Sequence, residues 1–268
     1  MTIKQAYERL QDAYKRFDGE TSWKDYLAFS SKFRSYSMNN TALIFAQKPD
    51  ATFLKGYKAW QELGRHVRKG EKGIKIFAPL MKKEKDKTGQ EKRSLKGFRL
   101  INVFDLSQTA GDDTKLPLAL KGLSDNRDYT ELFEGIVANL DIPVEIEEMS
   151  YGQHGFYRIK EASIAINKRN SSLHSLKTLI HELAHHYRIQ LLKGKRHKLS
   201  INQEEFIAES SAYLVCTRLG IDTAEYSIPY IKGWMDDFKA FQVLRKAIET
   251  TVKQIEQLIP QDDRREVA

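Results

Sequence analysis

The sequence predicts an α+β protein of two domains, and three observations support this fold class. Helical spacing of apolar residues alternates with short strand-like runs in the first 109 residues. The stretch AGDDTKLPLALKGLSDNRD, with two Gly, one Pro and several Asp, Ser and Asn residues, then interrupts the pattern. Two further helical segments follow it, and both carry acidic or imidazole side chains at four-residue spacing. We therefore expect domains at residues 1–120 and 121–268.

The first half is expected to contain four helices and one long hairpin. Each helix has apolar residues three or four positions apart, and the hairpin strands flank a Lys-rich, low-complexity stretch. The predicted helices cover residues 6–17, 22–34, a segment that ends before Pro49, and 57–63; the predicted strands cover 74–80 and 98–104, with 82–97 as an exposed tip.

The second half is expected to place two strands before the first of its helices. The runs GFYRI and ASIAINK read as strands, and the helix begins near Leu173 or Ser175. Ser163–Asn167 is the candidate exposed edge, because a free strand beside a catalytic cleft can receive an extended peptide. A purely structural hairpin is the alternative.

Composition limits the classes of protein that this chain can belong to. The chain has 268 residues, 41% of them hydrophobic, so a packed core is expected. No apolar run reaches the roughly 20 residues that cross a bilayer, and the start does not resemble a signal peptide. We therefore expect a cytoplasmic protein with no membrane partner. Cys216 is the single cysteine, which excludes an internal disulfide and any Cys-rich zinc site. The oligomeric state is left open.

The positive charge is concentrated in the first half. The chain carries a net charge of +8. Residues 1–120 hold 24 Lys and Arg against 14 Asp and Glu, and residues 31–100 hold 18 against 6. Aromatic residues interleave with these cations, a mixture that holds single-stranded nucleic acid by stacking bases and neutralising phosphates. A solvated surface around an aromatic core is the alternative.

The segment TLIHELAHHYRIQ, residues 178–190, has the spacing of a metal site. On a helix, His181 and His185 share one face, and Glu182 lies beside them. Zinc held by two His and a carboxylate keeps a position for water, and Glu182 can take the proton of that water. Another divalent transition metal is the alternative. His186 points to a different side and is expected at the surface or behind the ligands.

A third ligand is expected on the next helix, NQEEFIAESSAYLVCTRLG. Glu205 and Glu209 are four residues apart on a mostly buried helix, where carboxylates need partners. We assign Glu205 as the third ligand and Glu209 as the acceptor that orients a histidine. The reverse assignment stays open, and Glu204 is expected to face solvent.

Several motifs together resemble one family. HELAHH followed by EEFIAESSAYLVCTRLGID resembles the zincin domain of ArdC-type antirestriction proteins, which are relatives of the ImmA/IrrE-like metallopeptidases. WKDYLAF, FRSYSMNNTALIFAQKPDATFLKGYKAW, LGRHVRKGEKGIKIFAPL and VFDLSQTAG resemble the domain of that family that binds single-stranded DNA (ssDNA). The resemblance covers roughly residues 5–245. The loop after the metal helix, HHYRIQLLKGKRHKLS, departs from the Trp-Thr-Gly start of many relatives.

The resemblance implies an ssDNA-binding domain at residues 1–120 and a zincin-like metallopeptidase domain at 121–268. It implies a protein encoded on a mobile genetic element, such as a conjugative plasmid, transposon or phage, that protects incoming DNA from host restriction enzymes. It also implies His181, His185 and Glu205 as ligands of Zn²⁺ and Glu182 as general base. Tyr36, Ser37, Asn40, Trp60, Gly64 and Arg65 match its DNA-binding signature. The residues expected to contact DNA are Tyr36, Asn40, Lys55, Tyr57, Trp60, Arg65, Lys69 and Lys72.

Three functions remain open at this level. The first is an antirestriction protein that binds ssDNA and carries a zinc peptidase. The second is a peptidase that cleaves a DNA-bound regulator or another protein or peptide. The third is a DNA-binding module with a structural metal site, which Glu182 disfavours because a structural site needs no base. Antirestriction by imitation of DNA needs an acidic surface and is disfavoured by the positive net charge.

Overall fold

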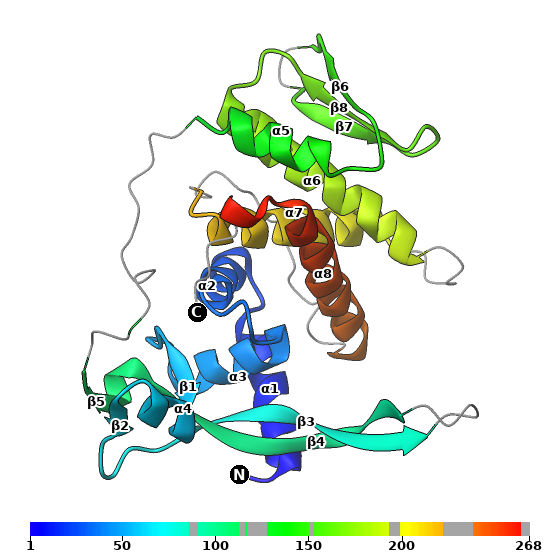
Figure 1. The fold of residues 1–268 in the computed structure, drawn as a ribbon. Coiled ribbons are helices and arrows are strands. Elements are labelled where there is room, and N and C mark those ends of the chain that lie inside the picture. The colour runs from blue at the N-terminus through cyan, green and yellow to red at the C-terminus, as the bar shows by residue number, and fades with distance from the viewer. Residues whose placement is uncertain are drawn as a thin grey trace. The chain divides into compact units, whose positions relative to one another are not determined.

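The computed structural model confirms the mixture of helices and strands and contains two compact units (Figure 1). It describes residues 1–85, 91–112, 116, 128–150, 153–192, 199–221 and 238–263. The N-terminal unit consists of Met1–Arg16 and Ser35–Leu118, and the C-terminal unit of Phe17–Arg34 and Ala119–Val267. Among the helices in these ranges, none is both long and apolar enough to cross a membrane.

The N-terminal unit combines three α-helices with two small sheets. Its elements are α1 (Ile3–Arg16), α3 (Met38–Gln47), β1 (Leu54–Gly56), α4 (Tyr57–Glu62), β2 (Arg65–Val67), β3 (Ile74–Lys85), β4 (Glu91–Asp105), the 3-10 turn η1 (Leu106–Gln108) and β5 (Thr109–Gly111). One sheet has the order β1-β4-β3, and β2 pairs with β5 in the other. All these pairs are antiparallel.

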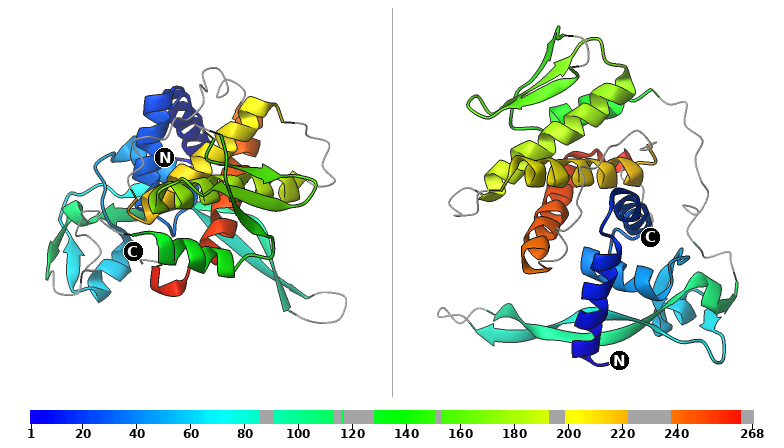
Figure 2. Two further views of the ribbon diagram at one scale, coloured as in Figure 1. Left: turned by 90° about the horizontal axis from the view of Figure 1, so that it is seen from above. Right: turned by 180° about the vertical axis from the view of Figure 1, so that it is seen from behind.

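Helix α1 lies across the β3–β4 hairpin, as both views show (Figures 1 and 2). Its buried side chains recur at helical spacing, which gives the helix one apolar face. They are Ala6, Leu10, Ala13 and Tyr14. The ring of Tyr7 lies 4.8 Å from that of Phe77 on β3. Thr2 and Gln5 cap the start of the helix reciprocally.

Two amide side chains of α3 cover the free edge of β3. The Asn40 amide bonds to both the N–H and the carbonyl of Phe77. Gln47 does the same for Lys75. Pro79, the next residue facing this edge, has no N–H to satisfy. Along residues 75–79 the edge is therefore closed to pairing with another strand.

The hairpin is longer than the sequence predicts. Residues 82–85 and 91–97, expected in an exposed tip, belong to β3 and β4. In a two-stranded ribbon the backbone groups pair across the strands whatever the side chains are, so a polar composition did not end the strands. The chain absorbs one extra residue in a bulge beside Leu80 and Met81. The expected tip at 86–90 lies outside the described residues.

The C-terminal unit packs three long helices on each other and on a small sheet. Its elements are α2 (Glu20–Ser31), α5 (Thr130–Ala138), β6 (Val144–Glu147), β7 (Gly155–Arg158), β8 (Ser163–Asn167), α6 (Ser172–Leu192), α7 (Ile201–Arg218), α8 (Phe238–Leu258) and the 3-10 turn η3 (Gln261–Asp263). Helix α6 contacts β7 and β8 as well as α5, α7 and α8 (Figure 1). The elements α5, β6 and α8 carried no recognised signal in the sequence.

The prediction of an exposed edge strand at residues 163–167 is wrong. Ser163–Asn167 is β8, the central strand of the order β6-β8-β7, and all five of its residues are buried. It pairs in parallel with β6 and antiparallel with β7. A strand with neighbours on both sides has no free backbone groups to offer, so the edge beside α6 is β7.

Residues Phe17–Arg34 fold with the C-terminal unit and not with the segments that flank them in sequence. The indole of Trp23 is fully buried, and its Nε1 donates to Ser210 Oγ on α7 at 3.0 Å. It also contacts the rings of Phe206 and Phe241. The N-terminal unit is therefore not the continuous segment 1–120 that the sequence suggested.

This placement corrects the aromatic–cation interpretation for α2. Four aromatic side chains that could have stacked on bases are instead core residues of the C-terminal unit, with exposed fractions of 0 to 3%. They are Trp23, Tyr26, Phe29 and Phe33. Burying such large apolar rings is worth more than leaving them on the surface.

Candidate metal centre

Helix α6 presents two histidines to one point. His181 and His185 are one turn apart, and their Nε2 atoms lie 3.1 Å from each other. The helix is fixed by apolar neighbours of these histidines that are fully buried, Leu179, Ile180, Leu183 and Ala184. The two imidazoles are 18% and 16% exposed, so they lie in the wall of the unit and remain reachable.

Helix α7 brings a carboxylate to the same point. A capping box between Ser200 and Gln203 starts the helix. One turn later, the Glu205 carboxylate lies 3.7 Å from the Nε2 of His181 and 3.5 Å from the Nε2 of His185. His181, His185 and Glu205 thus form a cluster whose donor atoms lie within 4.8 Å of one another.

Glu209 approaches His181 from the other side. Its Oε1 lies 3.4 Å from His181 Nδ1, the nitrogen that faces away from the cluster. Its Oε2 is buried and has no hydrogen-bond partner among the described residues. Glu205 and Glu209 therefore meet opposite nitrogens of one imidazole.

The protonation of the two histidines differs. Burial lowers the pKa of His181, but the hydrogen bond and charge of Glu209, with the charges of Glu182 and Glu205, outweigh it and raise the pKa. Burial, with the charges of His181 and Arg188, lowers the pKa of His185 to about 3. His185 is therefore neutral at physiological pH, the form that binds a metal.

Glu182 is a buried acid beside the cluster. Its exposed fraction is 8%. Burial raises its pKa, opposed by the His181 charge and by a hydrogen bond with the Tyr157 backbone. Burial likewise raises the pKa of Glu205. A carboxyl whose pKa moves towards neutrality can both accept and release a proton.

The other polar residues of this region hold the framework. His186 is 2% exposed, so it is neither at the surface nor among the ligands. Its Nδ1 lies 2.9 Å from the Tyr157 hydroxyl and its Nε2 2.8 Å from the Gln190 amide. Glu204, expected to face solvent, is only 30% exposed and pairs with Arg188 at 2.5 Å. Neither Tyr157 nor Arg188 could be found from the sequence, because each acts through a contact between separate elements.

The donor set fits a divalent transition metal. A tetrahedral ion with bonds of about 2.1 Å separates its ligand atoms by about 3.4 Å. The two Nε2 atoms are 3.1 Å apart, Glu205 Oε1 lies 3.5 Å from that of His185 and Oε2 lies 3.7 Å from that of His181, so each contact is close to that value. Two imidazoles and one carboxylate leave coordination positions for water or a substrate.

Three residues expected to contact DNA instead hold the N-terminal unit together. Trp60 is fully buried, and its Nε1 donates to the Phe104 carbonyl at 2.9 Å. Arg65 is buried, and its guanidinium donates to Thr109 and Gly111. The Asn40 amide is hydrogen-bonded to both backbone groups of Phe77 on β3. All three side chains are thus hydrogen-bonded to other residues of the N-terminal unit.

The remaining expected DNA contacts lie nearer the surface. Tyr57 is 50% exposed, and Lys69 and Lys72 are exposed. Lys55 is half-buried with its Nζ over the Phe53 ring, 5.1 Å from the centroid. Tyr36 is half-buried and donates to the Leu54 carbonyl at 3.3 Å, and burial raises its pKa.

Known proteins resemble both units. Residues 2–104 match the family model of the N-terminal domain of anti-restriction factor ArdC. The fold is shared with crystal structures of the antirestriction ArdC protein from the R388 plasmid. The metal-free form is 21% identical, with a TM-score of 0.58, over 83% of this chain and 85% of the ArdC chain. The Mn(II)-bound form is 20% identical, with a TM-score of 0.55, over 83% and 84%.

One curated relative is an uncharacterized protein of Bacillus anthracis. It is 30% identical over an alignment of 281 positions, gaps included, which covers 89% of this chain and 47% of the relative. The chain thus spans about half the length of the curated relative that it matches. Residues 2–104 thus match the N-terminal domain of ArdC, and the chain shares the ArdC fold.

Proposed function

We infer that this ArdC-type chain is an antirestriction protein of a mobile genetic element, which binds ssDNA through its N-terminal unit and carries a metal-dependent peptidase site in its C-terminal unit. The observation that carries the peptidase part is the convergence of His181, His185 and Glu205 beside the buried Glu182. Domain, fold and positive charge support the antirestriction and DNA-binding parts.

In this proposal, His181 and His185 hold the metal through Nε2, and Glu205 is the third ligand. Glu209 accepts a hydrogen bond from His181 Nδ1, which fixes the ring and leaves Nε2 free for the metal. Zn²⁺ is the proposed ion, and Mn²⁺ or another divalent transition metal is the alternative, since a related ArdC was crystallised with Mn(II). A bound divalent metal acidifies a coordinated water and polarises a substrate carbonyl.

Glu182 is the proposed general base. Its burial and raised pKa let it take a proton and later pass it to the leaving amine. A metal that only stabilised the fold would need no such neighbour, so the structural-metal alternative leaves Glu182 unexplained.

The proposed substrate is an extended peptide beside β7. This strand pairs on one side with β8, and the Tyr157 backbone on it is hydrogen-bonded to Glu182. A peptide added along this edge would pass the proposed metal ligands, with main-chain hydrogen bonds supplying affinity. Whether such cleavage acts on a restriction component or on a DNA-bound regulator defines the two forms of the peptidase hypothesis.

The proposal is tested by Glu182→Gln in the full chain, loaded with Zn²⁺ or Mn²⁺. We expect this variant to bind metal and ssDNA like the wild type and to lose cleavage of a quenched-fluorescence peptide library. Plasmid protection during conjugation into a restricting host is then measured for both. Unchanged cleavage in the variant would remove Glu182 from the mechanism. Unchanged protection would assign antirestriction to DNA binding alone.

A further inference from the structure

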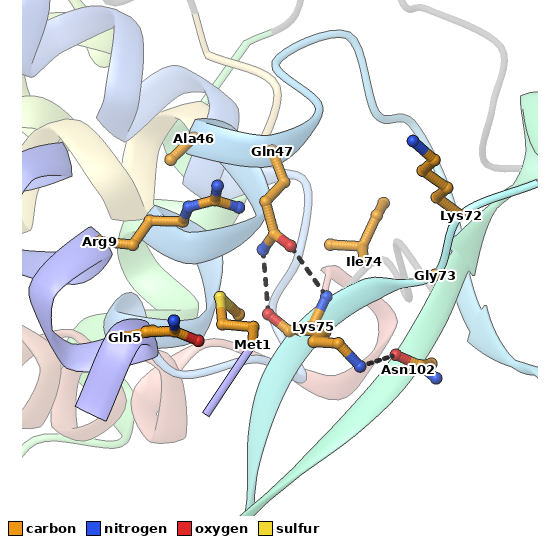
Figure 3. Close-up of a pocket in the computed structure, with 10 residues that line it drawn as sticks. All are labelled: Met1, Gln5, Arg9, Ala46, Gln47, Lys72, Gly73, Ile74, Lys75 and Asn102. Carbon is orange, nitrogen blue, oxygen red and sulfur yellow. Dashed lines mark hydrogen bonds between the residues drawn. The ribbon is translucent and has the colours of Figure 1, made fainter. Parts of the chain in front are cut away.

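A basic pocket lies on the N-terminal unit between α1, α3 and the start of β3 (Figure 3). Its volume is about 890 Å³. Three cationic side chains line it, Arg9 from α1 and Lys72 and Lys75 from the start of the hairpin. None of its lining residues in the described part of the chain is acidic. The pocket therefore favours an anion.

The cations are available to a ligand. The side chains of Arg9 and Lys72 are exposed and make no hydrogen bond or ion pair with any residue that the structure describes. Within the described part of the chain, Lys75 Nζ is hydrogen-bonded to the neutral Asn102 Oδ1, at 3.0 Å, and to no carboxylate. By contrast, Arg68 and Glu71 nearby neutralise each other at 2.9 Å. The pocket thus keeps its full positive charge.

The pocket is built on a rigid frame. Gln47 binds both backbone groups of Lys75, at 3.1 and 3.0 Å, and lies between Arg9 and Lys75 in Figure 3. A side chain at Gly73 would come within 2.7 Å of Asn102, so a glycine is needed for the strands to approach here. The backbone that carries Lys75 and Asn102 is therefore held in a fixed position opposite α1.

Acidic residues limit the basic surface on one side. The neighbouring hollow along α1 shares Gln5, Arg9 and Ala46 with the pocket, but its acids Glu8 and Asp12 offset the charges of Arg9 and Arg16. A polyanion is therefore attracted less to this hollow than to the side of the pocket formed by Lys72 and Lys75. The charge pattern thus defines a short basic site and not a uniformly charged face.

We propose that this pocket, and not the face around Trp60 and Arg65, holds the phosphodiester backbone of ssDNA. The inference rests on the proposed function and locates its DNA site. A pocket of this volume can hold one nucleotide of a flexible single strand. The exposed amides of Gln5 and Asn102 can form hydrogen bonds with its unpaired base. Of the residues expected from sequence, only Lys72 belongs to this site.

The test uses the full-length chain and a fluorescein-labelled oligo(dT) of about 12 nucleotides, a length typical of single-strand sites. One variant carries Arg9→Gln, Lys72→Gln and Lys75→Gln. The matched variant carries Lys55→Gln, Lys58→Gln and Lys69→Gln, an equal loss of charge that includes two cations predicted from sequence to contact DNA, Lys55 and Lys69. Anisotropy gives Kd between about 50 and 200 mM salt, the range over which phosphate contacts weaken. Thermal melting checks that both variants fold.

Each phosphate contact on a single strand contributes about 0.7 to the salt slope of log K, so losing three should lower the slope by about 2. Over this salt range, the affinity of the pocket variant should fall about 20-fold less than that of the wild type. The matched variant should keep the wild-type slope, as should the charge-preserving Arg9→Lys and Lys75→Arg. An oligonucleotide with neutral methylphosphonate linkages should abolish the difference between wild type and pocket variant.

Two results would overturn the inference in distinguishable ways. If the wild type binds oligo(dT) and only the matched variant lowers the slope, ssDNA binding stands and the pocket is not its site. If the wild type shows no salt-dependent binding at all, the DNA-binding part of the proposed function fails together with the inference.

Discussion

His181 Nδ1 lies 3.4 Å from Glu209 Oε1, while the Nε2 of the same ring faces Glu205 at 3.7 Å. One imidazole is thus held by a carboxylate on each side, both from α7. The nitrogen that faces Glu205 also faces His185, so the two acids have different surroundings. Loss of Glu205 and loss of Glu209 should therefore affect metal binding differently.

Glu205→Ala should weaken metal binding by at least about 100-fold, because it removes one of three protein ligands. Metal affinity is measured by competition with a fluorescent chelator. Glu204→Gln, one position earlier, keeps an acceptor for Arg188 and should leave the affinity unchanged. An equal decrease in metal affinity in Glu205→Ala and Glu204→Gln would argue against Glu205 as a ligand.

Glu209→Gln should lower metal affinity by about 10- to 100-fold, the range for partners that orient a ligand. The variant should also lower the pKa of His181, because the Glu209 hydrogen bond and charge raise it in the wild type. NMR titration of the imidazole in the metal-free protein tests the second effect. If Glu209 were itself the third ligand, Glu209→Gln would lower the metal affinity more than Glu205→Ala does.

At a pH below the His181 pKa, metal binding should release one proton from the histidines. His185, with a pKa of about 3, is already neutral, whereas the raised pKa of His181 keeps a proton there above the ordinary value of 6.5. Affinity should therefore rise about tenfold per pH unit up to the His181 pKa and then level off. Calorimetry in buffers of different protonation enthalpy counts the protons. Release of two near neutrality would contradict a neutral His185.

Trp60→Ala should destabilise the N-terminal unit by about 3–5 kcal/mol, because a fully buried indole is removed from a close-packed site. Trp60→Phe keeps most of the packing and loses the bond to the Phe104 carbonyl, which costs about 1 kcal/mol. Tyr57→Ala, at a half-exposed ring, should change stability by less than about 0.5 kcal/mol. Urea unfolding compares the three, and a stable Trp60→Ala protein would contradict the core placement.

Trp23→Ala should destabilise the C-terminal unit, although Trp23 lies early in the sequence. The loss should be about 3–5 kcal/mol, since the ring is fully buried and bonded to Ser210. Hydrogen exchange should show the lost protection in α7 and not in the β3–β4 hairpin. If protection from hydrogen exchange were lost only in the β3–β4 hairpin, α2 would belong to the N-terminal unit.

The sequence by itself determined the local elements and the local part of the candidate site. Helical spacing located α1, α2, α4, α6 and α7 to within a few residues, because the period of apolar residues reflects one buried face. The spacing of His181 and His185 placed two imidazoles on one helix face for the same reason. The mixed fold class followed from these patterns.

Only the tertiary structure decided which elements meet. It assigned α2 to the C-terminal unit, made β8 the central strand, and placed Trp60 and Arg65 inside the N-terminal unit. It also set Glu205 and Glu209 against opposite nitrogens of His181, and gathered Arg9, Lys72 and Lys75 around one pocket. Periodicity reports that a face is buried but not what buries it, because packing partners are chosen by shape and contact between segments distant in sequence.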